Sequence, residues 1–468
     1  MAVESYSARL EAPKSIFRAY DIRGIVDEDL TPEIVYHIAL AIGSEAQSLG
    51  EKSIIVARDC RLSSPELSKT LVQGLLNTGC DVIDIGTVPT PVLYFATHTL
   101  AFKSGVMLTG SHNPGHYNGL KIVLGGKTLA GNDIQDLYQR IAEGNYRLSQ
   151  DRGRLSEQNI VDYYIQRICG LVQLKRPLKV VIDCGNGVAS IVAPQLFKSL
   201  GCEVVELYCE ADGRFPNHHP DPSVPENLQD LIATVLSEKA DLGLAFDGDA
   251  DRLGAVTNEG QIIWPDRQMM LFARDILSRH EGATIIFDVK CSAELAHLIT
   301  AHGGNPLMCQ TGHSLVKAKM VETHALLAGE LSGHIFFKER WYGFDDALYA
   351  GCRLLEILSQ QTMHLSELFQ QIPDHVNTPE LRVSIAEEKK FSFMRQLKQQ
   401  ADFSDGKIIT IDGLRVEYEQ GWGLVRASNT SPYLILRFEA QDEAALSHIQ
   451  AIFKQQLLSV DSELEIPY

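Results

Sequence analysis

A repeated order of short apolar runs and helical patterns constrains the fold of this chain more than any other feature. The runs 53–57, 178–182 and 284–287 each end at polar or glycine-containing residues. Helical patterns such as 64–78 and 188–200 follow them. Continuous apolar runs of this length, separated by helical segments, are typical of strands in the buried interior of a parallel sheet.

Each of these runs has a second partner further along the chain. The runs 105–108, 242–246 and 325–328 lead directly into the loops TGSHNP at 109–114, DGDADR at 247–252 and GELSGH at 329–334. The order strand, helix, strand, polar loop therefore occurs three times. This repeat predicts an α/β protein that begins with three similar mixed-sheet domains.

The end of the chain has a different pattern. Short strand-like runs at 381–385, 407–411, 414–418 and 423–427 are flanked by helical patterns at 388–400 and 444–458. This pattern predicts a smaller α+β domain. Because the chain has 468 residues and domains usually have roughly 100–200, we place four domains at 1–157, 158–260, 261–372 and 373–468.

Charge and cysteine content restrict the class of protein. The net charge of −18 opposes binding to the phosphate backbone of nucleic acids, so we expect no nucleic-acid partner. The nine cysteines are scattered without a Cys-X-X-Cys pair, which favours a reducing compartment over a disulfide framework. The sequence has no signal-peptide pattern and no stretch of about 18 uninterrupted apolar residues. We therefore expect a cytoplasmic protein with no membrane partner.

Three aspartates occupy every second position of the loop 247–252. Asp247, Asp249 and Asp251 follow a predicted strand, so their carboxylates can turn to one side of the loop. Carboxylates packed this closely repel one another unless a cation joins them, and hard oxygen ligands suit Mg²⁺. An EF-hand is excluded, because Arg252 and Asn258 stand where its glycine and glutamate are required. The alternative interpretation is a solvated acidic turn.

Ser111 stands between Gly110 and a turn-forming Asn-Pro pair at the end of another predicted strand. Glycine lets a phosphate approach the backbone closely, and the serine hydroxyl could act as a nucleophile. On spacing alone, an ordinary turn is the better interpretation, and the Gly-X-Ser-X-Gly pattern of a hydrolase is absent. A nucleophilic role is favoured only if the aspartate loop lies opposite Ser111, where a phosphoserine could fill an open metal position.

Two further loops carry groups that suit a phosphorylated sugar. One combines a planar guanidinium with small polar side chains, which suits a phosphate; its members are Arg426, Ser428, Asn429 and Thr430. A surface turn is the alternative interpretation there. The other loop contains Glu330 and Ser332, an acceptor and a donor for neighbouring hydroxyls.

Several polar residues at strand ends or in glycine-containing loops are weaker candidates. They are Tyr20, Arg23, Lys121, Lys290 and His313. Each alone fits a surface or capping role at least as well. The histidines at 218 and 219 lie in a proline-rich run, 215–222, which favours a rigid loop over a zinc site.

Together these loops resemble those of the α-D-phosphohexomutase superfamily, and most closely its bacterial phosphomannomutase/phosphoglucomutase group. The resemblance extends from FRAYDIRG at 17–24 to the segment 426–432, and it is carried by the ordered set TGSHNP, DGDADR, GELSGH and RASNT. It implies four domains around a central cleft. It also implies an isomerase (an intramolecular phosphotransferase) that interconverts hexose 1-phosphate and hexose 6-phosphate, of mannose and/or glucose.

The resemblance further implies a phosphoserine enzyme that requires Mg²⁺ and forms a hexose 1,6-bisphosphate, which also acts as activator. Ser111 matches the phosphorylated serine, whose phosphate completes a Mg²⁺ site with Asp247, Asp249 and Asp251. Arg252 follows the third aspartate as in the family and should steady that phosphate.

The remaining roles are also carried over from the resemblance. Glu330 and Ser332 match residues that hold sugar hydroxyls. The candidates for proton transfer or charge stabilisation are Arg23, Lys121 and His334. Further expected substrate contacts are Tyr20, Lys290, His313, His334, Arg426, Ser428, Asn429 and Thr430, the last four around the phosphate that does not react.

Details of the loops favour a hexose enzyme over a phosphoglucosamine mutase, which is the main alternative. Leu331 stands where methionine is common, rather than the glutamine expected in glucosamine enzymes, and TGSHNP differs from their usual SASHNP. Cys60 replaces a usual glycine, outside the motif loops.

A phosphosugar-binding protein without activity would lack the nucleophile or a metal ligand, and a metal-dependent hydrolase would release phosphate steadily. The sequence does not rank glucose against mannose, and we expect a monomer with a small phosphosugar substrate.

Overall fold

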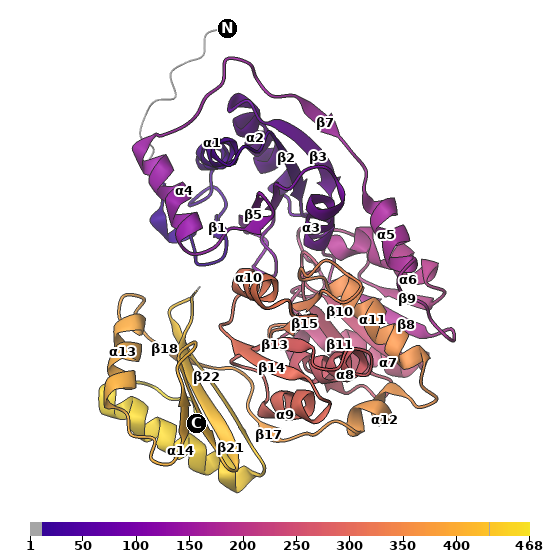
Figure 1. The fold of residues 1–468 in the computed structure, drawn as a ribbon, viewed down its shortest axis with the longest axis vertical. Helices are drawn as coiled ribbons and strands as arrows, with labels where there is room; N and C mark the ends of the chain where they lie inside the picture. The colour runs from indigo at the N-terminus through magenta and orange to yellow at the C-terminus, as the bar shows by residue number, and fades with distance from the viewer. Residues whose placement is uncertain (1–11, 430) are drawn as a thin grey trace.

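The computed structural model describes residues 12–429 and 431–468, and within them the strands form four sheets. The first three sheets contain parallel and antiparallel pairs, whereas the described strands of the fourth are all antiparallel. Figure 1 shows the domains from the indigo N-terminal domain at the top to the yellow C-terminal domain at the bottom. This arrangement confirms the predicted fold class of three similar α/β domains followed by a smaller α+β domain.

The first domain packs helices against a seven-stranded sheet. In chain order its elements are η1 (Lys14–Ile16), β1 (Ile22–Ile25), α1 (Pro32–Ser48), β2 (Ser53–Arg58), α2 (Ser64–Asn77), β3 (Asp81–Thr87), α3 (Thr90–Thr99), β4 (Gly105–Leu108), β5 (Tyr117–Leu124), β6 (Lys127–Thr128), α4 (Asn132–Glu143) and β7 (Leu155–Glu157). The strand order is β1-β5-β4-β2-β3-β7, and β6 pairs with β5.

The second domain has a five-stranded sheet with the order β12-β11-β10-β8-β9. In chain order its elements are α5 (Val161–Cys169), β8 (Lys179–Asp183), η2 (Val188–Ile191), α6 (Ala193–Ser199), β9 (Glu203–Leu207), η3 (Pro225–Leu228), α7 (Gln229–Glu238), β10 (Leu242–Phe246), β11 (Leu253–Thr257) and β12 (Ile262–Ile263).

The third domain has a four-stranded sheet with the order β14-β13-β15-β16. In chain order its elements are α8 (Pro265–Leu277), β13 (Thr284–Asp288), α9 (Ala293–Ala301), β14 (Asn305–Cys309), α10 (His313–Thr323), β15 (Leu327–Gly329), β16 (Ile335–Phe337), α11 (Ala347–Ser359) and α12 (Leu365–Gln370).

The three domains share one strand order. In each, a first strand (β2, β8 or β13) lies parallel to both of its neighbours, and the second neighbour is followed by an antiparallel strand. The equivalent paths are β3-β2-β4-β5, β9-β8-β10-β11 and β14-β13-β15-β16. The loops 109–116, 247–252 and 330–334 connect the last two strands of these paths. The repeat therefore places three loops of different chemistry at equivalent corners of three sheets.

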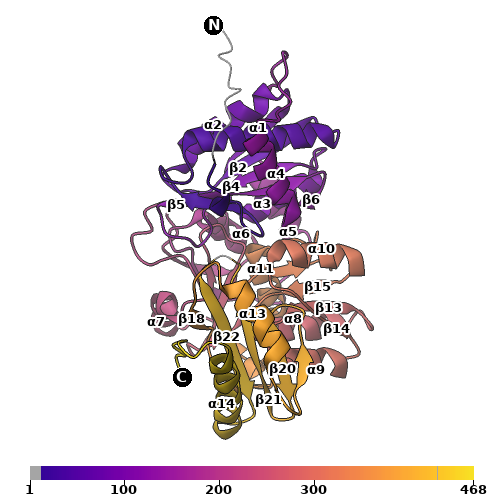
Figure 2. The same ribbon diagram turned by 90° about the vertical axis from the view of Figure 1, so that its left-hand side faces the viewer.

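The fourth domain is an antiparallel sheet covered by two helices. In chain order its elements are β17 (Val376–Asn377), β18 (Leu381–Ser384), α13 (Lys390–Gln400), β19 (Lys407–Ile409), β20 (Leu414–Tyr418), β21 (Gly421–Ala427), β22 (Tyr433–Ala440) and α14 (Glu443–Val460). The strand order is β17-β22-β21-β20-β19, and β18 also pairs with β22. Helices α13 and α14 pack together against this sheet (Figure 2).

Local capping chemistry fixes where several helices begin. The Thr31 hydroxyl accepts a hydrogen bond from the N–H of Ile34 at the start of α1. The Asp442 carboxylate accepts one from the N–H of Ala445 at 2.8 Å at the start of α14. Such caps pair backbone N–H groups that the first turn of a helix leaves without an internal partner.

One apolar core extends through the first three domains, whereas the fourth has its own. Phe95 of α3 stacks on Trp341 of the third domain, with ring centroids 5.7 Å apart. The fourth domain meets the third through a small apolar cluster of Val289, Trp422 and Leu424. Because burial of apolar surface is the main stabilising force between packed elements, the first three domains form one unit to which the fourth is joined less extensively.

The structure contains strands that the apolar runs did not reveal. β3, β9 and β14 lie between the two helices of each repeat, and β22 completes the fourth sheet. β9 and β14 are largely exposed or half-buried edge strands, so they lack the continuous apolar run of a central strand. The predicted helix 188–200 is divided into η2 and α6, since Pro194 occupies the first turn of α6.

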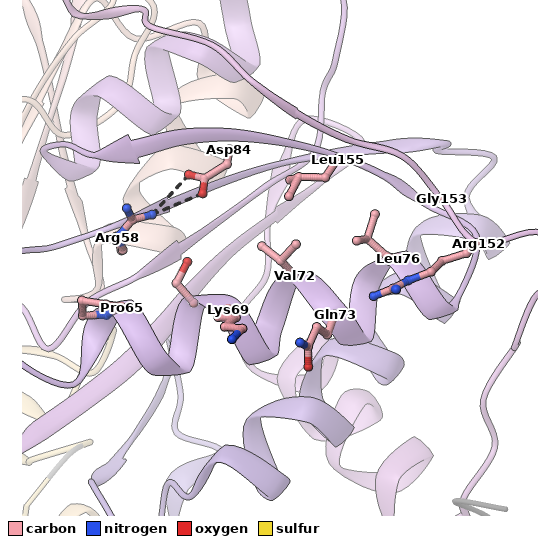
Figure 3. A pocket seen from close by; sticks show the side chains of 11 residues that line it. Arg58, Pro65, Lys69, Val72, Gln73, Leu76, Asp84, Arg152, Gly153 and Leu155 are labelled. Carbon is pink, nitrogen blue, oxygen red and sulfur yellow. Dashed lines mark hydrogen bonds and ion pairs between the residues drawn. The ribbon is translucent and has the colours of Figure 1, made fainter. Parts of the chain in front are cut away.

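A pocket of about 500 Å³ lies beside α2, between this helix and the segment that leads to β7 (Figure 3). Its lining combines the apolar Val72 and Leu76 with the cationic Lys69, Arg152 and Arg58. None of the predicted site residues is among its lining residues. Among the described residues, no helix has the length and apolar character needed to cross a membrane.

Candidate active site

Ser111 lies in a buried turn after β4, with its backbone in the left-handed region at φ 49°. The turn is fixed locally, because the Ser111 N–H donates to Thr109 Oγ1 at 2.8 Å. Its Oγ donates to Asp247 Oδ2 at 3.1 Å. Non-glycine residues in this backbone region are uncommon and are held there by their surroundings. The structure therefore meets the condition that the sequence set for a nucleophile, an aspartate loop opposite the serine.

Arg61, which the sequence analysis did not single out, holds the backbone of this serine loop. Its side chain is buried and pairs with Asp59 at 3.1 Å. The guanidinium donates to four loop carbonyls, those of Ser111 at 2.8 Å, Asn113 at 2.5 Å, Pro114 at 2.5 Å and Tyr117 at 3.0 Å. A Cβ on Gly110 would lie 2.4 Å from the guanidinium, so glycine is required for this approach. No sequence signal marks Arg61, because the exposed Arg214 has the same Asp-X-Arg spacing to Asp212.

The three aspartates of the loop 247–252 form a buried group. Asp247, Asp249 and Asp251 are each 0% exposed, and one carboxylate oxygen of each lies within 4.8 Å of the others. In the described part of the chain, Oδ1 of Asp249 and Oδ1 of Asp251 have no hydrogen bond. Burial, together with repulsion from Asp251 and Asp249, raises the pKa of Asp247 well above its usual value. Such clustered oxygen ligands with unused lone pairs fit a hard divalent cation.

Lys121 of β5 brings a positive charge from the first domain to these aspartates. Its buried Nζ donates to Asp249 Oδ2 at 2.7 Å and also to Asp251. Burial lowers the pKa of Lys121, but the aspartates outweigh this effect and hold the pKa above its usual value. Burial likewise raises the pKa of Asp249, but Lys121 and the Thr90 hydroxyl, 2.5 Å from Oδ2, bring the pKa below its usual value.

The predicted sugar loop lies between β15 and β16. Glu330 is buried and accepts a hydrogen bond from the backbone N–H of Gly312, while Ser332 is half-buried. Burial raises the pKa of the Glu330 carboxyl above its usual value. One loop thus presents an acceptor and a donor, as recognition of neighbouring hydroxyl groups requires.

His334, at the end of this loop, connects the second and third domains. A β-bridge pairs its backbone with that of Arg252, and Arg252 Nε donates to His334 Nε2 at 3.1 Å. Arg252 also lies 3.9 Å from Asp247. The ring of His334 stacks on that of His313, with centroids 5.4 Å apart. The predicted residues Arg252, His313 and His334 therefore meet at the end of the aspartate loop.

Asn429, in the loop after β21, connects the fourth domain to the first. Its Nδ2 donates to the Tyr20 hydroxyl, which in turn donates to the carbonyl of Thr311 at 2.7 Å. This chain of hydrogen bonds joins residues of the first, third and fourth domains, and Figure 1 shows the two end domains approaching each other beside α10. The predicted substrate contacts Tyr20 and Asn429 are thus direct neighbours.

The other members of the predicted phosphate loop have partners within the fourth domain. Arg426 Nε donates to Asp412 Oδ2 at 3.0 Å, and Ser428 Oγ lies 2.8 Å from Ser431 Oγ. Thr430, the last predicted member, lies outside the described residues. Arg426 therefore lies near the end of β21, and Ser428 lies in the loop that follows this strand.

Arg23 and Lys290 lie at two other points around the site. Arg23 Nη1 donates to Asn113 Oδ1 at 2.5 Å and to the carbonyl of Gly110 at 3.2 Å, so it contacts the serine loop directly. Lys290 is buried at the boundary between the third and fourth domains, where its Nζ donates to Glu380 Oε1 at 2.6 Å.

The two neighbouring histidines of the run 215–222 face different partners. His218 Nε2 lies 2.9 Å from Asp183 Oδ2. His219 lies near His112 and Asp221, which contact each other at 2.9 Å between Nδ1 and Oδ2. Burial lowers the pKa of His112 to about 4. Among the described residues, the group that could hold a metal here includes His219 but not His218.

Comparison with known proteins places this architecture in one family. Models of phosphoglucomutase/phosphomannomutase alpha/beta/alpha domains I, II and III and of the C-terminal domain match residues 14–147, 162–260, 264–376 and 380–456. The phosphomannomutase/phosphoglucomutase of Pseudomonas aeruginosa is 56% identical over 97% of this chain and 98% of its own length. The phosphoglucomutase of Neisseria gonorrhoeae is 53% identical over 94% of this chain and 96% of its own.

A solved structure agrees with these sequence comparisons. The crystal structure of a phosphoglucomutase/phosphomannomutase family protein from Burkholderia thailandensis matches with a TM-score of 0.93 and 50% identity, over 97% of this chain and 100% of that chain. This chain therefore belongs to the phosphoglucomutase/phosphomannomutase family, which confirms the resemblance inferred from its four loops.

The anchoring of the serine loop by Arg61 leads to a testable prediction. The variant Arg61→Ala removes the cationic partner of the buried Asp59 and one hydrogen-bond donor from each of four backbone carbonyls, so the free energy of unfolding should fall by about 3–5 kcal/mol. The measurement is the first transition in urea denaturation, followed by tryptophan fluorescence.

Arg214→Ala is a matched control for this prediction. Arg214 has the same Asp-X-Arg spacing to Asp212, and its Nε is also 3.1 Å from the aspartate Oδ2, but its side chain is 72% exposed. This variant should unfold at nearly the same urea concentration as the wild type, because an exposed ion pair contributes little to stability. Equal losses in the two variants would show that Arg61 does not anchor the loop.

Proposed function

We propose that this chain is a phosphohexomutase that interconverts the 1-phosphates and 6-phosphates of glucose and mannose through phospho-Ser111 and a hexose 1,6-bisphosphate. One observation carries the proposal: the Ser111 hydroxyl, the three buried aspartates and Lys121 meet within hydrogen-bonding distance, although three different segments supply them. The relatives named phosphomannomutase/phosphoglucomutase and phosphoglucomutase support a hexose substrate over a glucosamine phosphate.

The proposed reaction is two phosphoryl transfers at one serine. In the first, the bond between phosphorus and Ser111 Oγ breaks while phosphorus bonds to the free hydroxyl oxygen of the sugar phosphate, and the hydroxyl proton leaves to a nearby base. In the second, the bond between the other phosphorus and its sugar oxygen breaks while that phosphorus bonds to Ser111 Oγ, and the sugar oxygen takes back the proton from the same base. The transition state of such transfers is loose and rich in negative charge, so fixed positive groups and positioning supply most of the catalysis.

The chain offers three groups for charge stabilisation and proton transfer. Arg23 contacts the serine loop, and Lys121 is held as an ammonium between two aspartates. Both are donors, so they suit the stabilisation of phosphoryl oxygens. His334 Nε2 accepts a hydrogen bond from Arg252, which makes it the ring nitrogen suited to accept the sugar proton.

The aspartate loop supports a role for Mg²⁺ in this reaction. Asp247, Asp249 and Asp251, completed by the phosphate on Ser111, would hold the ion. When bound, Mg²⁺ supplies positive charge beside the oxygens of the transferring phosphoryl group. Asp249 and Asp251 each keep one buried oxygen without a hydrogen bond for this purpose within the described residues.

The fourth domain supplies the proposed anchor for the phosphate that does not react. The guanidinium of Arg426 and the small polar groups of Ser428, Asn429 and Thr430 suit a phosphate in either orientation of the sugar. Glu330 and Ser332 would hold hydroxyls that glucose and mannose share. The separate core of this domain and its contact with Tyr20 support closure of the domain over the sugar, and a slight opening in which the bisphosphate turns.

The function is tested by a coupled assay with glucose 1-phosphate, mannose 1-phosphate and glucosamine 1-phosphate. Glucose and mannose 1-phosphates should give similar kcat/KM values, within about tenfold, because Glu330 and Ser332 contact hydroxyls common to both. The glucosamine substrate should be clearly slower, and a peptide containing Ser111 should carry phosphate by mass spectrometry.

Two outcomes would contradict this proposal. Steady release of inorganic phosphate from all three substrates would indicate a hydrolase instead. Full mutase activity in Ser111→Ala, with phosphate on another residue, would exclude Ser111 as the donor. The control variant is Ser63→Ala, which changes a serine outside the serine loop and should retain activity.

Metal removal gives a second prediction. Exhaustive chelation should abolish activity, and added Mg²⁺ should restore it. Asp251→Asn removes one ligand charge at constant size, so the Mg²⁺ concentration for half-maximal activity should rise by about tenfold or more. Asp183→Asn, which changes another buried carboxylate at the end of a strand of the same sheet, should leave that concentration unchanged. Unaltered activity of the wild type in excess chelator would refute the metal site.

The phosphate anchor gives a third prediction. Arg426→Ala should raise KM and let the bisphosphate escape before it turns, which leaves Ser111 without phosphate. The variant should therefore depend more strongly than the wild type on added glucose 1,6-bisphosphate. The measurement is turnover against added bisphosphate, with Arg395→Ala, a change of an exposed arginine on α13, as control. The same low bisphosphate requirement in Arg426→Ala and wild type, with unchanged KM, would place the anchor elsewhere.

A further inference from the structure

Asp345, a buried carboxylate that the proposed reaction does not use, lies behind His334. It precedes α11 and is 0% exposed. A β-bridge between its backbone and that of Phe336 fixes its position. Its Oδ1 accepts a hydrogen bond from Lys317 Nζ at 2.9 Å, and this ammonium lies 4.0 Å from the centre of the Tyr94 ring. The carboxylate and the ammonium thus form a buried, neutral pair.

The second oxygen of Asp345 faces the histidines. Oδ2 lies 3.2 Å from His334 Nδ1 and 3.5 Å from His313 Nδ1. Both Asp345 Oδ2 and His334 Nδ1 are buried, and within residues 12–429 and 431–468 neither atom has a hydrogen-bond partner, although they lie 3.2 Å apart. Because a buried polar group without a partner is costly, each of these two atoms is the natural partner of the other.

The other ring nitrogen of His334 determines where the proton lies. Nε2 accepts a hydrogen bond from Arg252 Nε, and a guanidinium nitrogen can only donate. In the neutral ring, the proton is therefore on Nδ1, the atom that faces Asp345. Stacking on His313 fixes the plane of the ring in this orientation.

A second carboxylate competes for this proton. Asp251 Oδ1 lies 3.5 Å from His334 Nδ1, slightly farther than Asp345 Oδ2. Asp251 Oδ1 is one of the oxygens left for a metal ion. By pairing with Nδ1, Asp345 leaves that oxygen of Asp251 available.

We propose that Asp345 is a positioning residue that holds the imidazole of His334 as the Nδ1–H tautomer, with Nε2 as the hydrogen-bond acceptor. The consequence for catalysis rests on the proposed function: Nε2 is the atom that would take the proton of the sugar hydroxyl once Arg252 turns to the phosphate. The tautomer itself does not depend on that function.

Nuclear magnetic resonance of the full chain with Mg²⁺, labelled with ¹⁵N-histidine, tests the tautomer at pH 8. Long-range ¹H–¹⁵N correlations distinguish the two neutral tautomers, and the His334 signals are identified by their loss in His334→Asn. We expect the Nδ1–H tautomer in the wild type. The Nε2–H tautomer in the wild type would overturn the proposal without any variant.

The variant Asp345→Asn tests whether Asp345 is the cause of the Nδ1–H tautomer of His334. Its amide oxygen is needed by Lys317, so its NH₂ group turns to His334 Nδ1 and requires an acceptor there. His334 should therefore change to the Nε2–H tautomer, and kcat should fall about 10- to 100-fold with KM within twofold of the wild type. An unchanged tautomer in this variant would also overturn the proposal.

Asp346→Asn is the matched control. Asp346 is the next residue and is equally buried, but its carboxylate accepts from Tyr164 and Trp341 and caps α11. This variant should keep the wild-type tautomer and kcat, so the same change of tautomer in both variants would overturn the proposal. If the wild type lacks mutase activity, the proposed function fails, while the tautomer measurements still decide the role of Asp345.

Discussion

Three buried carboxylates in one loop set the electrostatic condition that the rest of the structure meets. Asp247, Asp249 and Asp251 are fully buried and repel one another. A buried charge without a partner is strongly destabilising, so this loop is stable only with positive groups beside it. Lys121 comes from the first domain and Arg252 from the end of the loop itself. The docking of the first two domains and the assembly of the site are therefore one interaction.

The apolar core is divided between the first three domains and the fourth. The continuous core of the first three domains fixes the serine loop, the aspartate loop and the predicted sugar loop relative to one another. The fourth domain meets the third through a small apolar cluster and through polar pairs, such as Arg437 with Asp266 at 3.2 Å and Ser292 with Glu439 at 2.8 Å. Such a division suits the proposed reaction, in which phosphoryl transfer needs fixed geometry and the bisphosphate must turn.

The sequence located four polar loops at the ends of strands, because each loop is a local pattern, and the roles assigned to their residues stay predictions. It did not reveal the residues that hold those loops. Arg61 acts on the serine loop from fifty positions away, and Asp345 lies near His334 only because β16 returns the chain to it. Isolated arginines and aspartates are common on protein surfaces, so their sequence gives no sign of burial or of partners. The edge strands β9 and β14 were missed for a similar reason, since their half-exposed residues lack a continuous apolar run.

By itself, the sequence determined the number and class of the domains, the positions of the four polar loops and the family to which the chain belongs. These properties follow from the period of apolar residues and from short motifs, both of which are local. Only the tertiary structure decided that Ser111 faces Asp247, that Lys121 lies between two aspartates, and that Asn429 reaches Tyr20. These distances depend on how whole sheets dock against one another, and docking is determined by the summed burial and charge pairing of residues far apart in the chain.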